Sequence, residues 1–343
     1  MTEQNYTILV VDDNEAHRRL ERDILELSNN IVIEAKNGQE ALELLKQVNF
    51  DVVLMDKNMP VLDGDETSYK IRNDLNLKLL PILMVTGSDK RAELVKSLKA
   101  GANDFISKPY SPTELTARVN AAASLKRKTD QLDNMENMLY SLALMVEAKD
   151  GNTGDHCKRL SYSAEVFGEK IGLNSEELEA LKRGGVLHDI GKLGIPDNIL
   201  LKPGKLNAAE WEVMKTHTTI GYHICNSLRS IQSTTPIILS HHERWDGSGY
   251  PQKLKGNDIP LLAQVFQLLD IYDALAYARP YKPAFQIQHI INVINEEVSM
   301  GWRNPELANE FIELIEKDHN QLTPPEDYIV REPQEAFMEL TEI

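Results

Sequence analysis

The sequence predicts a chain of two domains, an α/β doubly wound domain followed by an all-α domain. In the first third, short apolar runs that end in polar residues alternate with helical patterns, which is typical of a parallel sheet. From Met135 onward, helical stretches separated by breakers dominate. The 343 residues are enough for two cores. We expect domains at residues 1–125 and 149–343, joined by a linker helix at 126–148.

The composition excludes several classes of protein. The formal net charge is -16, so the chain should repel polyanions and is not a general nucleic-acid binder. No long apolar run is present, so we expect no membrane span. The N-terminus MTEQNYTILVVDDNE lacks the basic region of a signal peptide. Two cysteines, Cys157 and Cys225, are too few for a disulfide framework. We therefore expect a cytoplasmic protein.

Four apolar runs are the expected strands of the first domain, at residues 8–11, 51–55, 81–85 and 104–107. They lead into Asp12 and Asp13, Asp56, Thr86, and Lys108. The carboxyl ends of parallel strands meet at one edge of a sheet, where ligands bind. Three carboxylates there favour Mg²⁺, and a carboxylate beside a lysine suits phosphoryl transfer. Asp12 and Asp13 alone would be read as solvated acids.

The motifs VVDDNE, LMDKNMPVLDG, TGS and SKP, within about residues 5–125, resemble the receiver domain of two-component response regulators. The resemblance implies that Asp56 accepts a phosphoryl group from a sensor histidine kinase. It also implies a Mg²⁺ site made by Asp12, Asp13 and the backbone carbonyl of Asn58, phosphoryl contacts from Thr86 and Lys108, and a switch aromatic at Phe105. Phe105 lacks the hydroxyl group of the commoner tyrosine.

The connecting segment is helical and free of breakers from Pro112 to Gly151. Seven-residue spacing relates Leu125, Leu132, Leu139 and Val146. This pattern indicates a coiled coil that forms a homodimer, although Lys128 interrupts the second heptad position. The alternative is a single amphipathic helix packed on its own domain.

Five histidines and two aspartates stand out in the second domain. They are His156 in DGNTGDH, His188 and Asp189 in VLHDIGKLGIPD, His217 in MKTHTTIG, His241 and His242 in HHERWDGSGYP, and Asp270 in LLDIYDAL. Imidazole and carboxylate together favour Fe, Mn, Zn or Ni over Mg²⁺. The set exceeds what one metal takes, so it predicts two metals with one bridging carboxylate. Such a pair can activate water for a phosphoryl displacement. The other four histidines are assigned ordinary core or surface positions.

Lys192 lies four residues after His188. If that helix continues, the lysine is one turn further and can meet a non-bridging phosphate oxygen. Gly191 and Gly194 permit a close approach at the same end.

The motifs HDIGKLGIPD, HHERWDGSGYP and LLDIYDALAYARPYK, within about residues 135–320, resemble the HD-GYP family of HD-superfamily phosphohydrolases, which are helical and hydrolyse cyclic di-GMP. The resemblance implies that the seven residues are metal ligands, that Asp189 bridges, and that Lys192, Arg279 and Lys282 contact the substrate. It also implies that the loop with Gly249, Tyr250 and Pro251 contacts domains that synthesise cyclic di-GMP. Asn152 replaces a glutamate that helps some members to hold a third metal, so we expect two.

The sequence thus predicts a two-component response regulator whose output is metal-dependent hydrolysis of cyclic di-GMP to linear pGpG, and it leaves open whether pGpG or GMP is the final product. Phosphorylation of Asp56 would regulate it. Fe or Mn are the expected metals, with Ni or Zn as alternatives. Two other functions stay open: a cyclic-dinucleotide sensing or scaffold module with little catalysis, and an HD phosphohydrolase that acts on another nucleotide.

Overall fold

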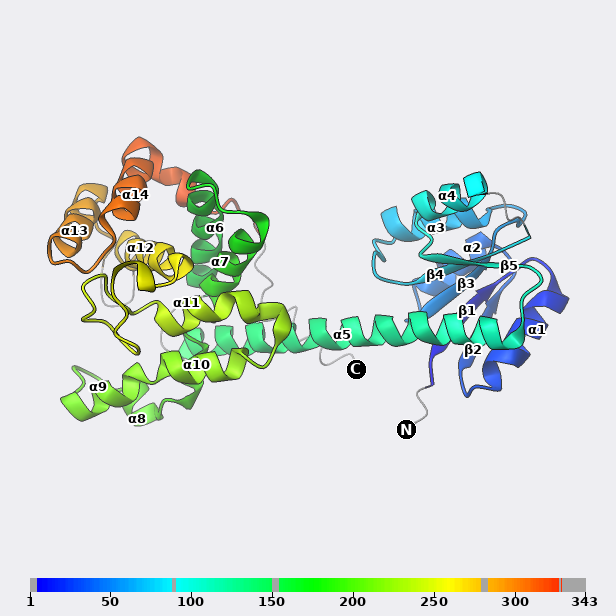
Figure 1. The fold of residues 1–343 in the computed structure, drawn as a ribbon, viewed down its shortest axis with the longest axis horizontal. Coiled ribbons are helices and arrows are strands. Elements are labelled where there is room, and N and C mark those ends of the chain that lie inside the picture. The colour runs from blue at the N-terminus through cyan, green and yellow to red at the C-terminus, as the bar shows by residue number, and fades with distance from the viewer. Residues whose placement is uncertain (1–4, 88–90, 150–153, 279–282, 327, 329–343) are drawn as a thin grey trace. The chain divides into compact units, whose positions relative to one another are not determined.

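The computed structural model describes residues 5–87, 91–149, 154–278, 283–326 and 328. The chain divides into two compact units, Met1–Asp133 and Asn134–Ile343 (Figure 1). The unit boundary falls inside one continuous helix, α5 (Pro112–Lys149). The domain limits expected at residues 125 and 148 stay a prediction.

The first unit is built on a parallel sheet of five strands in the order β2-β1-β3-β4-β5. The strands are β1 (Thr7–Val11), β2 (Ile31–Ala35), β3 (Val52–Asp56), β4 (Ile82–Thr86) and β5 (Asp104–Ser107). This order is the doubly wound, flavodoxin-like arrangement, so the predicted fold class is confirmed. The predicted polar residues lie at or directly after the carboxyl ends of β1, β3, β4 and β5.

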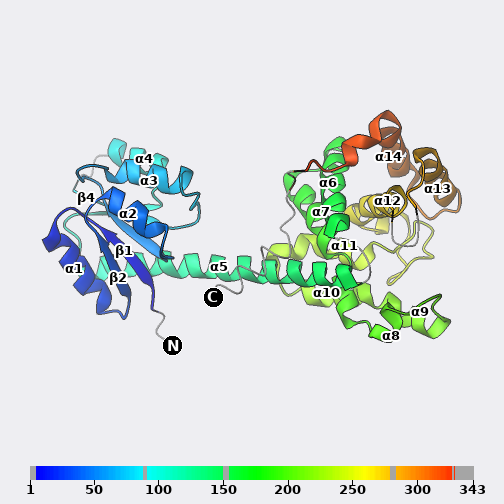
Figure 2. The ribbon, with the colours of Figure 1, turned by 180° about the vertical axis from the view of Figure 1, so that it is seen from behind.

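Helices cover both faces of this sheet (Figure 2). One face packs on α1 (Glu15–Glu26) and the beginning of α5, through Ile24, Leu115 and Val119. The opposite face packs on α2 (Gly38–Leu45) and α3 (Gly64–Asn73), through Ala41 and Ile71. Helix α4 (Arg91–Ala100) packs beside α3. Because the central strands are buried on both faces, they appear in the sequence as continuous apolar runs.

Strand β2 was not among the four strands predicted from the sequence. It lies at the edge of the sheet and pairs only with β1. Its first residue, Ile31, is 54% exposed, and Glu34 within it pairs with Arg18 and Arg22. An edge strand needs no unbroken apolar run, so its sequence signal is weak.

All regular elements among the described residues of the second unit are helices, as predicted. Its elements are α6 (Gly154–Lys170), α7 (Ser175–Leu187), η1 (Ile190–Gly194), α8 (Asp197–Leu200), α9 (Ala208–Lys215), α10 (His217–Cys225), η2 (Arg229–Thr234), α11 (Thr235–Ser240), η3 (Gly256–Asp258), α12 (Leu261–Ala276), α13 (Ile287–Ser299), α14 (Pro305–Asp318) and η4 (His319–Leu322). Phe167, Phe266 and Phe311 from α6, α12 and α14 are fully buried in the main core. None of the described helices has both the length and the apolar content needed to cross a membrane.

The heptad pattern of α5 divides between two environments. Leu125 and Leu132 are 66% and 48% exposed, so the first half presents an apolar stripe. Val146 is buried, and Leu139 packs on a cluster that contains Leu187. The second half therefore follows the alternative stated above, a helix packed on its own domain, whereas Leu125 and Leu132 in the first half stay exposed.

Candidate functional site

The structure brings all seven predicted metal ligands together in two neighbouring groups. One group holds Asp189, His217, His241 and His242, and the other holds His156, His188 and Asp270. Within each group the candidate ligand atoms lie within 4.8 Å of one another. These residues come from segments far apart in the sequence, namely α6, the α7–η1 junction, α10, the end of α11 and α12.

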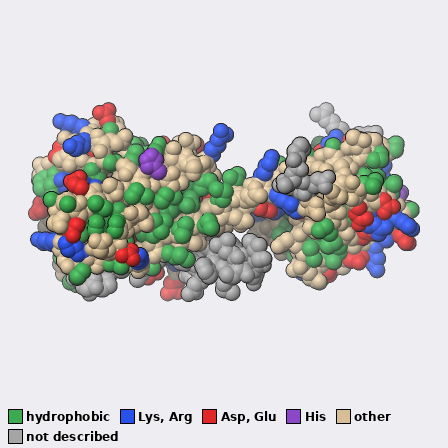
Figure 3. Space-filling view, turned by 90° about the horizontal axis from the view of Figure 1, so that it is seen from below, with side chains coloured by type: hydrophobic (Ala, Val, Ile, Leu, Met, Phe, Trp, Pro, Cys, Tyr) green, Lys and Arg blue, Asp and Glu red, His purple; other side chains and the backbone are tan. Residues whose placement is uncertain are grey.

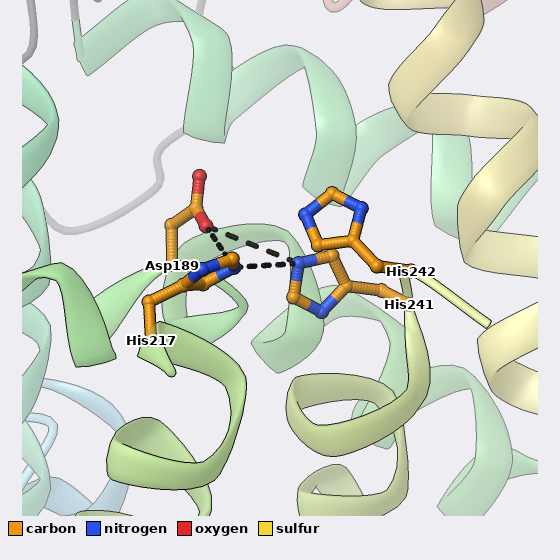
Figure 4. A group of neighbouring side chains, drawn as sticks. All are labelled: Asp189, His217, His241 and His242. Atoms are coloured by element: carbon orange, nitrogen blue, oxygen red, sulfur yellow. Dashed lines mark hydrogen bonds and ion pairs between the residues drawn. The ribbon is translucent and has the colours of Figure 1, made fainter. Parts of the chain in front are cut away.

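Asp189 connects the two groups. Its Oδ1 lies 3.3 Å from Nε2 of His217 and 3.9 Å from Nε2 of His241 (Figure 4). Its Oδ2 lies 3.3 Å from Nε2 of His188. Oδ1 is buried and accepts no hydrogen bond from any described residue. A buried carboxylate oxygen without a donor, surrounded by imidazole nitrogens, fits a site for a divalent cation.

The local backbone explains why Asp189 points into the site. Helix α7 begins at a capping box formed by Asn174 and Glu177 and ends at His188. Asp189 leaves the α-helical conformation, with φ -101° and ψ 7°, and the short 3-10 helix η1 follows. The change of helix type turns the Asp189 carboxylate toward the imidazoles of α10 and α11.

The same turn corrects the prediction for Lys192. The α-helix does not continue to this residue, because η1 replaces it. In a 3-10 helix, residues three apart are aligned, so Lys192 stands over Asp189. Its Nζ lies 2.7 Å from Oδ2 of Asp189. Lys192 still reaches the site, but through Asp189 rather than along the helix of His188.

Gly191 serves a different contact from the one predicted. A Cβ atom at this position would lie 1.8 Å from the backbone oxygen of His217 and 2.5 Å from the backbone nitrogen of Gly221. The absence of a side chain lets η1 pack directly on the backbone of α10. This contact places His217 beside Asp189.

Backbone carbonyls orient two of the imidazoles. Nδ1 of His217 lies 2.8 Å from the oxygen of Met214, and Nδ1 of His241 lies 3.0 Å from the oxygen of Ile238. A carbonyl can only accept, so each Nδ1 carries a proton and donates it. The unprotonated Nε2 then faces Asp189, as a metal ligand requires.

Asp273 orients His156 and was missed from the sequence. Its Oδ2 lies 2.5 Å from Nδ1 of His156, and Arg159 donates to the same carboxylate. Asp273 is 2% exposed. The one available signal was its spacing, three residues after Asp270 in LLDIYDAL, which places both on one side of α12.

Burial controls the charge of the histidines. It lowers the pKa of His217 and of His241, and it lowers that of His242 to about 3. These three are therefore neutral near pH 7, the state that binds metal. Burial also lowers the pKa of His188, but the Asp189 carboxylate outweighs it and the value rises to about 9. A cation bound there would take the place of that proton.

Glu147 is a second acidic residue that the sequence did not reveal. It is 1% exposed on α5, and a carboxylate oxygen lies within 4.8 Å of ligand atoms of His188 and Asp189. Its segment, LALMVEAK, reads as an ordinary amphipathic helix. Asn152 and the two predicted substrate contacts, Arg279 and Lys282, lie outside the described residues.

The loop after His242 is held by a buried carboxylate. Glu243 is fully buried and accepts hydrogen bonds from the backbone N–H groups of Gln252 at 2.6 Å and Leu254 at 3.0 Å. A Cβ atom on Gly249 would lie 2.3 Å from the nitrogen of Arg244, so this position requires glycine. The loop thereby folds back against its own beginning, next to the ligand His242.

Tyr250 packs directly on this ligand. The centroids of the Tyr250 and His242 rings are 4.9 Å apart with an interplanar angle of 31°. Burial raises the pKa of Tyr250, so the phenol is neutral. The predicted GYP residues Gly249, Tyr250 and Pro251 therefore form one wall beside the predicted metal ligand His242.

The first unit holds its own cluster at the carboxyl edge of the sheet. Nζ of Lys108 lies 2.9 Å from Oδ2 of Asp12 and 2.6 Å from Oδ1 of Asp56. Burial raises the pKa of Asp56. Nδ1 of His17, which was assigned an ordinary position, lies 3.1 Å from Oδ2 of Asp12.

The other predicted residues of this unit surround the cluster. The backbone N–H of Asn58 donates to Asp56 at 2.8 Å. Thr86 is buried at the end of β4, Asp13 is exposed, and Phe105 packs on the sheet core that includes Met84. The Mg²⁺ ligand set and the switch role of Phe105 stay predictions.

Comparisons with known proteins agree with both parts of this description. The model of the response regulator receiver domain matches residues 8–120, and an HD domain model matches residues 140–307. A cyclic di-GMP phosphodiesterase of Thermotoga maritima is 34% identical over 336 residues, covering 90% of each chain. The cyclic di-GMP phosphodiesterase response regulator RpfG of Xanthomonas campestris is 35% identical, covering 81% of this chain and 80% of the relative. A 3'3'-cGAMP-specific phosphodiesterase of Vibrio cholerae is 40% identical over 188 residues, covering 54% of this chain and 35% of the relative.

Proposed function

This chain belongs to the family of response regulators that join a receiver domain to an HD-type cyclic di-GMP phosphodiesterase domain, and from that membership we propose that it hydrolyses cyclic di-GMP to linear pGpG under the control of Asp56 phosphorylation. The observation that supports this most directly is the position of Asp189. Its two carboxylate oxygens face two separate groups of ligands, which is the arrangement that a paired metal centre needs.

The HD domain implies divalent metal binding, and we assign two transition-metal ions to this centre. Asp189, His217, His241 and His242 would hold one ion, while His156, His188, Asp189 and Asp270 would hold the other. Mixed nitrogen and oxygen donors favour Fe or Mn, and they also suit Ni or Zn. When bound, such a pair supplies an activated water and offsets the negative charge of a phosphodiester.

The residues of the chain supply orientation and charge. Asp189 contacts both groups of ligands through its two carboxylate oxygens. Carbonyl and carboxylate partners fix the orientation of the imidazole rings. Lys192 shares the Asp189 carboxylate and is placed to contact a non-bridging phosphate oxygen. Arg279 and Lys282 remain predicted cationic contacts to the substrate.

A specific observation favours a second substrate of the same class. The relative with 40% identity over the HD region is named for 3'3'-cGAMP rather than cyclic di-GMP. Both are cyclic dinucleotides with two phosphodiester bonds, so one metal centre serves either, and the choice depends on contacts to the bases.

The test is hydrolysis by the purified full chain loaded with Mn²⁺ or, without oxygen, with Fe²⁺. Cyclic di-GMP, 3'3'-cGAMP and pGpG are supplied separately, and products are identified by mass spectrometry. We expect pGpG from cyclic di-GMP, and GMP as well if the second bond is also cleaved. Asp189→Asn should lower turnover by more than about 100-fold, while Asp197→Asn, an exposed acid on α8, should not. Absence of turnover with two metals bound per chain would refute the assignment.

The receiver domain implies a kinase as phosphoryl donor, and we propose that Mg²⁺ assists the transfer. Asp12, Asp13 and the carbonyl of Asn58 would hold the ion, with Lys108 contacting the phosphoryl group. The Lys108 ammonium already spans Asp12 and Asp56, so phosphorylation of Asp56 rearranges an existing ion-pair network.

We also propose that the exposed half of α5 forms a homodimer. Leu125, Leu132 and Met135 are 66%, 48% and 48% exposed on one helix, an unusual density of apolar surface. Leu132→Asp should convert a dimer to a monomer in sedimentation velocity, whereas Gln131→Ala should not. A monomeric wild-type chain at micromolar concentration would contradict this proposal.

A separate proposal concerns the rim of the GYP loop. Ser248, Gln252 and Lys253 are exposed around the buried Gly249, so the rim is open to a partner domain that synthesises cyclic di-GMP. Lys253→Glu should weaken binding of a purified synthase domain in calorimetry. Binding unchanged by this reversal of charge would exclude the rim as the contact.

A further inference from the structure

A pocket of about 820 Å³ opens beside the metal ligand His242. It lies between the end of α9, the beginning of α10 and the GYP loop. We call it the Trp211 pocket and define it by six lining residues, Trp211, Lys215, His242, Arg244, Tyr250 and Lys253. Among its described lining residues, His242 is the one member of the predicted ligand set.

A continuous run of aromatic rings leads from the metal ligands into the pocket. Tyr250 lies on the ring of His242, and the ring centroid of Trp211 is 6.5 Å from that of Tyr250 at an interplanar angle of 79°. Trp211 itself is 45% exposed. Close to half of the Trp211 surface is therefore open to the solvent.

Apolar side chains are also exposed on the elements beside the pocket. Seen from below, on the side where α8 and α9 lie in Figure 1, hydrophobic side chains gather over this unit (Figure 3). The large exposed apolar residues of α8, α9 and the turn after α8 are Leu201, Trp211 and Val213. An exposed indole at the mouth of a pocket is a typical stacking platform for a planar ligand.

The polar lining has the opposite character and is mainly cationic. Four lining side chains are basic and one, Glu212, is acidic. Glu212 pairs with Lys215 at 2.7 Å, and Glu297 pairs with Arg303 at 2.7 Å. Two basic lining residues, Arg244 and Lys253, remain outside these ion pairs. In a chain with a net charge of -16, these two cations make the pocket a local site for an anion.

Arg244 is the best placed of these cations. The Cζ atom of its guanidinium group lies 3.5 Å from the centroid of the Trp302 ring, so the group lies over an aromatic face. No carboxylate in the described part of the chain forms an ion pair with it. A fixed guanidinium group without a carboxylate partner retains its capacity for two parallel hydrogen bonds to phosphate.

We propose that the Trp211 pocket binds one purine nucleotide portion of the substrate, with the base stacked on Trp211 and a phosphate oxygen bound by Arg244. The inference rests on the proposed function, since it assigns the part of a dinucleotide that extends from the metal centre past His242 and Tyr250. The pocket thereby selects a substrate that carries a base and a phosphate together, and it distinguishes dinucleotides from simple phosphodiesters.

The experiment compares two probes on the Mn²⁺-loaded full chain by isothermal titration calorimetry. GMP carries both base and phosphate, and ribose 5-phosphate carries the phosphate alone. Trp211→Ala should weaken GMP binding about 10-fold and change the affinity for ribose 5-phosphate by less than about twofold. The same variant should raise KM for cyclic di-GMP more than it lowers kcat. Trp211→Phe should restore most of the affinity because it retains an aromatic face. Arg244→Gln should weaken the binding of both probes.

The matched control is Arg229→Gln, which removes an exposed arginine from η2, outside the pocket and outside the metal centre. This variant should change neither the affinity for either probe nor the KM for cyclic di-GMP. If Trp211→Ala and Arg244→Gln leave GMP affinity and KM unchanged in an active enzyme, the pocket assignment is wrong. If the variants weaken GMP binding but the wild-type chain hydrolyses no cyclic dinucleotide, the pocket assignment holds and the proposed function is wrong.

Discussion

Asp273 and His156 form a buried pair in which Oδ2 of the aspartate lies 2.5 Å from Nδ1 of the histidine. This contact fixes the proton on Nδ1 and leaves Nε2 to face the metal centre. The second carboxylate oxygen accepts a hydrogen bond from Arg159, whose guanidinium group lies 4.0 Å from the centroid of the Tyr277 ring. The orientation of one ligand thus depends on a chain of contacts that spans α6 and α12.

We expect Asp273→Asn to lower metal affinity at the His156 group by about 10- to 100-fold. The amide removes the negative charge that stabilises the donated proton and can also present its NH₂ group to Nδ1. Metal content after dialysis against a graded chelator measures the effect. The control is Asp258→Asn, an exposed acid on η3. Equal metal retention by both variants would show that Asp273 does not orient His156.

Gly249→Ala should destabilise the GYP loop, because its Cβ atom would overlap the backbone of Glu243 and Arg244. Backbone cannot yield as a flexible side chain can, so we expect a loss of about 1–3 kcal/mol in unfolding free energy and a rise in KM. Denaturant titration and steady-state kinetics measure both. Gln252→Ala is the control, since that residue is exposed and contributes its backbone N–H to Glu243. Wild-type KM in Gly249→Ala would argue against the loop as a wall of the site.

Glu243→Gln tests whether the buried Glu243 carboxylate holds the same loop in place. The carboxylate accepts from two backbone N–H groups, and an amide would turn one donor toward another donor. Leaving such a buried group unsatisfied costs about 1–3 kcal/mol. We expect faster proteolysis within residues 244–254 and a lower melting temperature. Unchanged protection of the loop would show that other contacts hold it.

Glu21 predicts how the stability of the receiver domain depends on pH. It is 1% exposed and accepts a hydrogen bond from the Tyr110 hydroxyl at 2.5 Å. Burial raises its pKa from 4.5 to about 7. The folded protein therefore keeps this proton up to about pH 7, whereas the unfolded chain releases it near pH 4.5. Stability should fall as pH rises across that window, by roughly 3 kcal/mol in total.

Glu21→Gln should remove this pH dependence, since an amide does not ionise. Melting of the first unit, followed by calorimetry of the full chain at pH 5 and pH 8, measures the difference. Glu26→Gln, an exposed residue on the same helix, should behave as wild type. A wild-type chain whose first transition is equally stable at both pH values would contradict the assignment.

Asp56→Asn should abolish phosphorylation by acetyl phosphate in the presence of Mg²⁺, because the nucleophilic oxygen is lost. Asp23→Asn, an exposed acid on α1, should still be labelled. Intact-mass spectrometry of the full chain detects the added phosphoryl group. Labelling of Asp56→Asn at the wild-type level would move the acceptor to another residue.

The sequence alone determined the order of the domains, their fold classes and the residues of the candidate metal site. Periodicity and breakers record which residues face a core, so the buried strands β1, β3, β4 and β5 and the long helix α5 were visible. The motifs supplied all seven candidate ligands, because metal chemistry restricts residue type more strictly than packing does. The edge strand β2 was not predicted, because the exposed Ile31 and the charged Glu34 weaken its apolar pattern.

Only the tertiary structure decided how these residues meet. The 3-10 turn that puts Lys192 over Asp189 depends on the backbone at Asp189, which sequence spacing does not record. Asp273, Glu147 and His17 approach their partners across contacts between elements distant in the chain. Trp211 on α9 likewise lines the pocket together with residues of the distant GYP loop. Local pattern reports what each segment buries, whereas a site arises from the distances between segments, and packing alone fixes those distances.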